Sequence, residues 1–218
     1  MNNIETDLPV PFSRLVLFDF DGTLTRGDTF GAFLVFSVPW WKLATGTFSL
    51  LFILAPLVFL EKNTRAERAK AAILKVFFGG KSREELERTA LAFCEKRLPR
   101  LLRPPMMKLL EASRDAGDTV AVVSASMDLW LQPFCKQERI LLICTELAYD
   151  AGIFTGRFAT PNCNRQEKAR RIREVFRLEQ FAPIVAYGNS AGDAAMFELA
   201  HEAWYCLPDG RMKKWEST

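Results

Sequence analysis

The feature that most constrains this chain is a pair of aspartates at the end of an apolar run. Residues 15–18 are apolar, Asp19 and Asp21 follow with one residue between them, and Gly22 comes next. Such a run, ending at a turn residue, is typical of a buried strand. Side chains alternate along a strand, so we expect both carboxylates to lean the same way. Crowded carboxylates need a divalent cation, or a proton on one of them, and both conditions suit phosphoryl transfer.

Three further segments carry groups that phosphoryl transfer needs. They are Ser124 to Ser126 after the apolar run 119–123, Lys168 at the start of a basic helix, and Asn189 and Asp193 after the apolar run 184–187. The Ser124 hydroxyl and the amides of Ala125 and Ser126, at a helix N-terminus, suit a phosphate. Lys168 supplies a point charge, and Asn189 and Asp193 supply oxygen ligands for a hard cation such as Mg²⁺. Ligands of open α/β sheets gather at the C-terminal ends of strands, where all these groups fall.

From residue 15 to about residue 210, this order of motifs resembles the haloacid-dehalogenase superfamily of phosphohydrolases. Within it, the chain is similar to the phosphoserine-phosphatase-like branch, subfamily IB. The similar segments are Asp28-Thr29-Phe30, Val123-Ser124-Ala125-Ser126, Asn162-Cys163 with Glu167-Lys168, and Tyr187 to Asp193. The Asp-x-Phe-Gly-x-Phe-Leu pattern from Asp28 to Leu34 is also similar to a phosphatidylglycerophosphate phosphatase of the same branch.

The resemblance implies a role for each matching residue. Asp19 would be the nucleophile that forms an aspartyl-phosphate, and its other oxygen would bind the metal. Asp21 would protonate the leaving group and then activate water, and its main-chain carbonyl would also bind the metal. Ser124 and Lys168 would hold the phosphoryl oxygens. The remaining implied roles are phosphate binding by Gly22 and Ala125, Mg²⁺ binding by Asn189 and Asp193, and substrate binding by Asp28.

Two of these positions have a second interpretation. Many members of the superfamily carry Gly-Asp where this chain has Gly188-Asn189. An amide oxygen can still bind Mg²⁺, but one negative charge is lost, so we expect a weaker metal site that depends more on Asp193. The same difference leaves open a weakly active or non-catalytic, phosphate-binding scaffold. Asp28 could instead be the N-cap of the helix that follows it.

Alternating strand and helix patterns predict an α/β fold, with a Rossmann-like three-layer core around a parallel sheet. The expected strands are 14–18, 119–123, 140–144, 182–187 and 203–206, and the expected core helices are 105–116, 127–137, 166–177 and 193–200. Residues 152–157 are interpreted as a turn or small edge hairpin.

Residues 27–103 break this alternation, and we interpret them as an inserted α-helical cap. Ser82 and Glu85 have capping-box spacing, which predicts a helix with Leu86, Ala90 and Phe93 on one face. A second amphipathic helix is expected at 66–78. The predicted domains are a core of residues 1–26 and 104–218 and a cap of residues 27–103.

The cap contains an uncharged run, residues 43–60, that is long enough to be a membrane-span candidate. Pro56 and several small polar residues weaken that interpretation, and Pro39-Trp40-Trp41 before the run is typical of an interfacial anchor. Two alternatives remain, a buried helical hairpin or a peripheral membrane contact within residues 29–60. Residues 61–114 hold 14 Lys/Arg and 7 Asp/Glu, which suits either anionic lipid or a small anionic substrate.

These residues together predict a Mg²⁺-dependent phosphomonoester phosphatase that acts on a small phosphorylated substrate. The alternatives are a membrane-associated phosphatase of a phospholipid head group, the scaffold, and transfer of the phosphoryl group to an alcohol. Nucleic-acid binding is not expected, because no recognition module accompanies the charge. Five scattered cysteines without a CxxC pair, and a polar start at 1–11 unlike a signal peptide, favour the cytoplasm, with the inner face of the membrane as the alternative.

Overall fold

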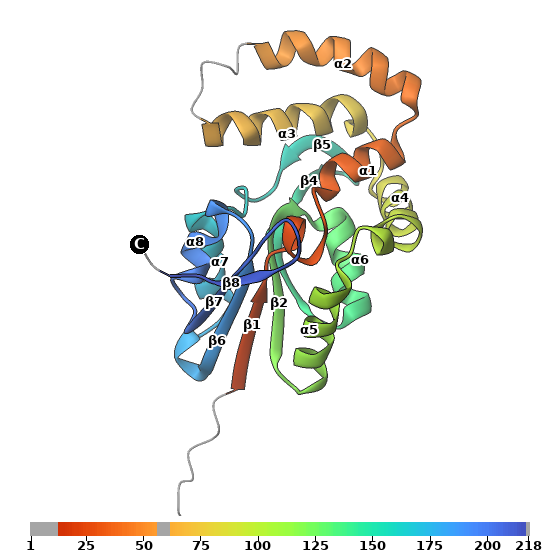
Figure 1. Ribbon diagram of the computed structural model, residues 1–218. Coiled ribbons are helices and arrows are strands. Elements are labelled where there is room, and N and C mark those ends of the chain that lie inside the picture. The colour runs from red at the N-terminus through yellow and green to blue at the C-terminus, as the bar shows by residue number, and fades with distance from the viewer. Residues whose placement is uncertain (1–12, 56–61, 217–218) are drawn as a thin grey trace, which may run out of the picture.

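The computed structural model describes residues 13–55 and 62–216, with a mostly parallel sheet at its centre (Figure 1). Its strands, in order across the sheet, are β3 (Leu141–Thr145), β2 (Thr119–Met127), β1 (Ser13–Phe18), β6 (Phe181–Gly188), β7 (Glu202–Cys206) and β8 (Met212–Lys214). Neighbouring strands are parallel except β7 and β8, which are antiparallel. The five strands expected from the sequence are all present, and the short edge strand β8 is an addition that the sequence pattern did not indicate.

Side chains of β1 alternate between two separate cores. Val16 and Phe18 pack on one face of the sheet, Leu15 and Leu17 pack on the other, and all four are fully buried. The helices α5 (Pro104–Asp115) and α6 (Asp128–Glu138) cover the first face, and α7 (Gln166–Val175) and α8 (Ala194–Phe197) cover the second. A parallel strand between two helical layers must be apolar on both sides, which explains the unbroken apolar run. The predicted three-layer α/β core is confirmed.

The cap helices lie on the side of the sheet where β1 and β2 end (Figure 1). They are α1 (Thr29–Ser37), α2 (Trp40–Leu54), α3 (Lys62–Phe78) and α4 (Arg83–Lys96). Ser82 caps α4, because its Oγ accepts a hydrogen bond from the Glu85 amide at 3.2 Å. The predicted apolar face of α4 is confirmed, since Leu86, Ala90 and Phe93 are all buried.

A hairpin from the second half of the chain packs against the cap. It consists of the antiparallel strands β4 (Leu147–Asp150) and β5 (Ile153–Phe158). Gly80, just after α3, donates its amide to the Phe154 carbonyl at 3.0 Å, and the Phe154 amide donates to the Lys81 carbonyl at 2.9 Å. Gly156 lies so close to α3 that a Cβ would be 2.6 Å from the Lys75 side chain. The expected hairpin is therefore present, but it supports α3 instead of lying at the edge of the main sheet.

Two elements near the C-terminal ends of the strands differ from their expected ranges. β2 runs on to Met127, because its pairing with β3 shifts register between Ser124 and Met127, and α6 begins only after it. The expected helix 193–200 is shorter, because a 3₁₀ turn over Ala191–Asp193 precedes α8. Ser190 stabilises that turn, since its Oγ accepts a hydrogen bond from the Gly192 amide at 3.1 Å.

The apolar run of the cap lies mainly in α2, which packs against α3. The two helices meet closely at Gly46, where a Cβ would lie 2.4 Å from the Phe77 ring. Trp40 and Trp41, at the start of α2, are exposed. No helix within residues 13–55 and 62–216 is both long enough and apolar enough to span a bilayer. Residues 56–61, and the polar start of the chain, lie outside the described residues.

Asp128 at the start of α6 provides a test of the packing between this helix and β4. Its Oδ1 accepts a hydrogen bond from the Leu147 amide at 3.2 Å, and burial raises the pKa of the Asp128 carboxyl to about 6. The native state therefore binds this proton more tightly than the unfolded chain, and stability falls as the pH rises from about 4 to about 6. We expect Asp128→Asn, which keeps the acceptor and cannot ionise, to raise the free energy of unfolding by about 1–3 kcal/mol near pH 8.

Urea unfolding at about pH 4 and about pH 8 measures this difference. The substitution should change the free energy of unfolding little at the lower pH, where Asp128 is protonated in the native state. An equal effect at both pH values would show that burial does not hold this carboxyl in its neutral form.

Candidate active site

A buried lysine joins three elements at the C-terminal ends of the strands. Lys168, in the first turn of α7, is only 2% exposed. Its Nζ donates to Asp19 Oδ1 at 2.7 Å, to Asp193 Oδ1 at 2.6 Å and to the Val123 carbonyl at 2.7 Å. An ammonium group has three protons, so these three acceptors use all of them. The structure thus brings together Asp19, Lys168 and Asp193, which the sequence analysis had placed on three separate segments.

Burial sets the electrostatics of this cluster. It raises the pKa of Asp19 to about 7, against the opposing effect of Lys168, and the nearby carboxylates of Asp193 and Asp21 raise it further. For Lys168, burial alone would lower the pKa, but the attraction of Asp19 and Asp193 outweighs it and raises the pKa. The pKa of Asp193 is lowered, because Lys168 and Ser190 outweigh its burial. Asp193 therefore keeps its charge, and ionised Asp19 needs a further positive partner.

Asp21 has hydrogen-bond partners other than those of Asp19, and the strand alternation from which its direction was predicted does not extend to it. β1 ends at Phe18, and the chain then forms an irregular turn in which strand alternation no longer applies. Asp21 Oδ1 accepts hydrogen bonds from the Thr29 amide and the Thr29 hydroxyl, both at 2.7 Å, and Oδ2 bonds to the Ser126 hydroxyl. Burial raises the pKa of Asp21, and these donors oppose the rise. Asp21 is thus held between the first cap helix and the end of β2.

Ser124 is buried at the predicted strand end, but its neighbours differ from expectation. The Ser126 amide donates to Ser124 Oγ at 3.0 Å, so this amide already has an acceptor within the protein. No helix begins at Ala125, because β2 continues past Ser126. Lys70 of α3 reaches this loop and donates to the Ala125 carbonyl at 3.2 Å. The cap therefore places a positive charge beside the segment predicted to bind phosphate, although the sequence did not single out Lys70 among the basic residues of 61–114.

Asn189 closes the other side of the site. In the orientation that satisfies its hydrogen bonds, the Asn189 side-chain nitrogen donates to Asp19 Oδ2 and to the Asp21 main-chain carbonyl, each at 3.2 Å. Gly22, with φ +80°, lies beside it, and a Cβ on Gly22 would be only 2.0 Å from the other terminal atom of the Asn189 amide. The glycine is required here both for its positive φ and for the close approach of Asn189.

Asp28 is the N-cap of α1, as the second interpretation of this residue had it. Its Oδ2 accepts a hydrogen bond from the Gly31 amide at 2.8 Å. The carboxylate also lines a cavity of about 370 Å³ that reaches the site from the surface. Other residues that line this cavity are Asp21, Gly22, Arg26, Arg103 and Asn189.

Residues 16–198 match the family model of the haloacid dehalogenase-like hydrolases. The chain belongs to this family. The match covers the sheet apart from its last two strands, β7 and β8, the cap and the segments that carry Asp19, Ser124, Lys168, Asn189 and Asp193, and it confirms the resemblance that the motifs indicated.

Individual relatives and structures agree with the family. Protein CicA of Caulobacter vibrioides is 36% identical over 200 residues, which cover 90% of this chain and 87% of CicA. A Bordetella pertussis protein of unknown function has a similar structure, with a TM-score of 0.71 at 23% identity and 88% of each chain covered. A substrate-bound phosphoserine phosphatase complex has a TM-score of 0.59 at 17% identity, over 88% of this chain and 84% of that chain. At these identities the two structures show that the fold is shared.

Sequence reasoning missed several residues that hold this hydrolase site together. Thr23 donates to Asp19 Oδ2 at 3.1 Å, and it could have been found as the last residue of the Asp-x-Asp-Gly-Thr motif. Thr29 was noticed only as part of a similar segment, although it makes two of the three hydrogen bonds to Asp21. Trp130, which donates its indole N–H to Thr29 Oγ1 at 3.0 Å, carried no signal other than an apolar side chain in a helix.

The contact between Gly22 and Asn189 can be tested by comparing two glycines. We expect Gly22→Ala to lower the free energy of unfolding by about 1 kcal/mol from the positive φ alone, and by more because the new Cβ displaces Asn189. Gly117 is a matched control, since its φ is +85° and nothing lies within 4 Å of a Cβ there. Denaturant unfolding of both variants measures the difference. Equal losses would mean that the approach of Asn189 to Gly22 adds no constraint.

Proposed function

We propose that this hydrolase is a Mg²⁺-dependent phosphomonoester phosphatase that works through an aspartyl-phosphate. The observation that carries the proposal is the environment of Asp19, a buried carboxylate whose Oδ1 is held by Lys168 and whose Oδ2 lies 3.2 Å from the Asn189 amide, which also contacts the Asp21 carbonyl. A carboxylate fixed in this way is suited to attack phosphorus, because one oxygen is oriented while the other can share a cation.

The residues around Asp19 Oδ2 fit a magnesium ion. With the Asn189 oxygen turned toward the site, it would lie 3.2 Å from Asp19 Oδ2 and 3.2 Å from the Asp21 carbonyl oxygen, and a hard cation bound by these oxygens would remove their repulsion. In the hydrogen-bonded orientation the Asn189 nitrogen donates to Asp19 and Asp21, and a half-turn of the amide exchanges this nitrogen for the oxygen. The oxygen orientation is the one that binding of Mg²⁺ requires. When bound there, the ion would neutralise the charge that the raised pKa of Asp19 shows to be costly, and would polarise the phosphoryl group.

The reaction proceeds in two steps in this proposal. Asp19 Oδ1 forms a bond to phosphorus as the bond from phosphorus to the ester oxygen breaks, and Asp21 gives its proton to the leaving alcohol. Asp21, now a carboxylate, takes a proton from a water molecule that attacks the aspartyl-phosphate, which releases phosphate and restores Asp19. Lys168 keeps Asp19 oriented throughout, and Asp193 keeps Lys168 charged.

The other assigned roles remain part of this proposal. Ser124, Ala125 and Gly22 would bind the phosphoryl oxygens, together with Lys168. Asp193 has both oxygens bonded to protein donors, so its contribution to the metal would be through water or through its hold on Asn189. The cap of residues 27–103 would close over the core of residues 1–26 and 104–218 and exclude water.

The comparisons support a small phosphorylated substrate. Several similar structures are described as phosphoserine phosphatases, among them a substrate-bound complex and an analogue of a phospho-aspartyl intermediate. Asp28 lines the cavity that reaches the site, and we propose that it contacts the substrate there.

Substitution of the nucleophile gives the direct test. We expect Asp19→Asn to lower the rate of p-nitrophenyl phosphate hydrolysis by at least about 10³-fold, because an amide cannot form the phosphoenzyme. Asp118→Asn is the control, since Asp118 precedes β2 at the opposite end of the sheet and pairs with Arg14 at 3.4 Å. Released phosphate with and without Mg²⁺ is measured for both. Unchanged activity in Asp19→Asn would contradict the proposal.

The same Mg²⁺ titration separates the enzyme from a phosphate-binding scaffold. The amide of Asn189 lowers the charge of the cation site, so the scaffold predicts phosphate binding without turnover at any Mg²⁺ concentration. Turnover by the wild-type protein that is lost in Asp19→Asn would exclude the scaffold.

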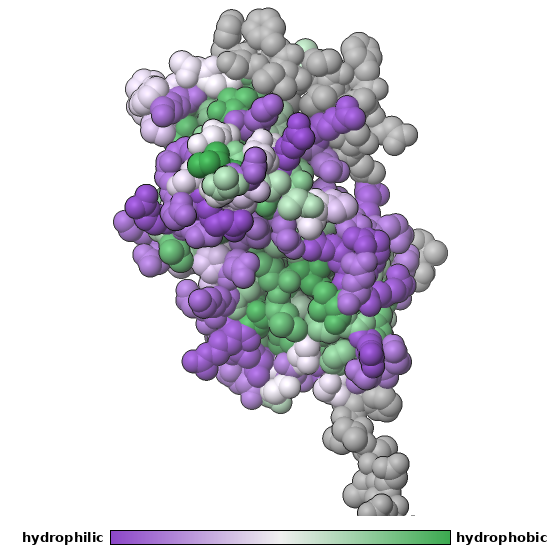
Figure 2. Space-filling view, turned by 180° about the vertical axis from the view of Figure 1, so that it is seen from behind, coloured by the Kyte–Doolittle hydropathy of each residue, from purple (hydrophilic) through white to green (hydrophobic). Residues whose placement is uncertain are grey.

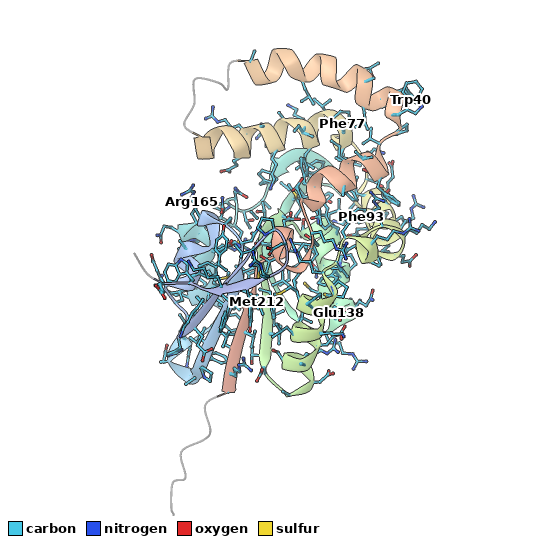
Figure 3. The ribbon with its side chains drawn as sticks, viewed as in Figure 1. Trp40, Phe77, Phe93, Glu138, Arg165 and Met212 are labelled. Atoms are coloured by element: carbon cyan, nitrogen blue, oxygen red, sulfur yellow. The ribbon has the colours of Figure 1, made fainter. Side chains whose placement is uncertain are left out.

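A lipid-phosphate substrate is a second candidate, favoured by one surface feature. At the corner between α1 and α2, Val35 is 69% exposed and Trp40 80% exposed, with Phe36 and Trp41 beside them in sequence. Figure 3 shows Trp40 pointing away from the molecule at this corner. Lys42 lies over the Trp41 ring at 5.2 Å, so a positive charge accompanies the apolar side chains. Exposed tryptophan next to lysine suits the interface of an anionic membrane.

Vesicle binding tests this candidate. We expect the wild-type protein to sediment with vesicles that contain phosphatidylglycerol more than with pure phosphatidylcholine, and Trp40→Ala to lose about tenfold in binding. Met212→Ala is the control, because Met212 is also exposed but lies on β8, away from the cap. Equal behaviour of wild type and Trp40→Ala would exclude this corner as a membrane contact.

A further inference from the structure

A chain of hydrogen bonds runs from the hydrophobic core to the general acid. Trp130 of α6 is fully buried and stacks on Phe33 of the cap, with ring centroids 4.9 Å apart. Its indole N–H donates to Thr29 Oγ1 at 3.0 Å. The indole nitrogen can only donate, and the packing of the ring fixes its direction. Thr29 Oγ1 is therefore held as an acceptor on the side that faces Trp130.

This contact decides where the Thr29 hydroxyl proton goes. A hydroxyl has one proton, and with Trp130 donating to the oxygen, that proton points to Asp21 Oδ1 at 2.7 Å. The Thr29 amide donates to the same oxygen at 2.7 Å. A carboxyl oxygen accepts two such bonds with its two lone pairs, so Asp21 Oδ1 has none left for a proton of its own.

The acid proton of Asp21 must then be on Oδ2. The Ser126 hydroxyl donates to this oxygen when Asp21 is ionised, and when Asp21 carries a proton on Oδ2 the hydroxyl can rotate and accept a hydrogen bond from that proton instead. Ser126 is itself fixed, because its amide donates to Ser124 Oγ at 3.0 Å. Before the reaction, the proton that Asp21 would give to the leaving group is thus hydrogen-bonded to the Ser126 hydroxyl.

We propose that Trp130 and Thr29 are positioning residues that keep the transferable proton on Asp21 Oδ2, and that they adapt the site to alkyl phosphates. The inference rests on the proposed phosphatase function and names the class of ester for that site. An alkoxide is a poor leaving group and must be protonated as the bond from phosphorus to oxygen breaks. The proton moves from Asp21 Oδ2 to that oxygen, and Asp21 is left as a carboxylate. An activated aryl leaving group departs with little need of this proton.

Two substrates therefore distinguish a misplaced acid proton from a general loss of structure. A misplaced proton should lower activity mainly on the alkyl ester, whereas a general loss of structure should lower activity on both esters. The variants Thr29→Val, Thr29→Ser and Trp130→Phe are compared on glycerol phosphate and on p-nitrophenyl phosphate. We expect Thr29→Val to lower kcat/KM for glycerol phosphate by about 10–100-fold and for the aryl ester by less than about 3-fold. Thr29→Ser keeps the hydroxyl and should retain the wild-type ratio between the substrates. Trp130→Phe keeps a ring without the N–H and should shift the ratio in the same direction as Thr29→Val.

The control for packing is Phe93→Leu. Phe93 is fully buried, and its ring lies edge-on to those of Phe33 and Trp130, but its side chain has no hydrogen-bonding group. This variant should leave the ratio between the two substrates unchanged. In the double variant Trp130→Phe with Thr29→Val, the ratio should shift no further than in Thr29→Val alone, because both residues act through one oxygen of Asp21.

The outcomes distinguish this inference from the proposed function. Equal losses on both esters in Thr29→Val, additive shifts in the double variant, or a wild-type protein that hydrolyses only the aryl ester would each overturn the inference. The dependence on Asp19 would still support a phosphatase in those cases. A wild-type protein that hydrolyses neither ester would remove the proposed function and the inference together.

Discussion

The buried ammonium of Lys168 is the interaction on which the site depends. It joins α7 to the residue after β1, to the main chain of β2 and to the turn after β6 through three hydrogen bonds. Breaking a buried pair typically costs about 3–5 kcal/mol, because the remaining charge has no partner. In this cluster two carboxylates share one lysine, so the removal of the lysine would leave two. The placement of Asp19 and Asp193 is thus inseparable from the packing of the second helical layer.

Charge imbalance connects this cluster to the proposed chemistry. Two carboxylates and one ammonium leave a net negative charge in a buried place, and burial, together with the repulsion from Asp193 and Asp21, raises the pKa of Asp19. Another positive charge next to Asp19 Oδ2 would relieve this imbalance and leave Oδ1 ionised. The Asn189 amide contacts Asp19 Oδ2 and the Asp21 carbonyl, so the proposed cation would lie on the Oδ2 side of Asp19, opposite the lysine that holds Oδ1.

The sequence was sufficient to predict the position of a residue where a single strand or helix determines it. Apolar runs ending in polar residues located β1, β2 and β6, and parallel pairing brought their ends together, so Asp19, Lys168 and Asp193 were found as a group. The hydrogen-bond partners of Asp21 were not predictable, because they depend on where β1 ends and on Thr29 of the cap. The packing of β4 and β5 against α3 could not be predicted from the sequence either, since it joins segments far apart in the chain. The same limit applies to Trp130, whose role appears only when α6 packs beside α1.

The surface of the molecule reflects these layers. Figure 2 shows polar side chains over much of the rear, with a hollowed apolar area on the core below the cap.

The hairpin of β4 and β5 has a consequence for evolution of the cap. Because β5 bonds to the residues after α3, an exchange of residues 27–103 with a relative would separate the inserted helices from their support. A chimera that keeps its architecture would have to inherit residues 147–158 as well, so substrate choice and this distant hairpin are expected to change together among homologues.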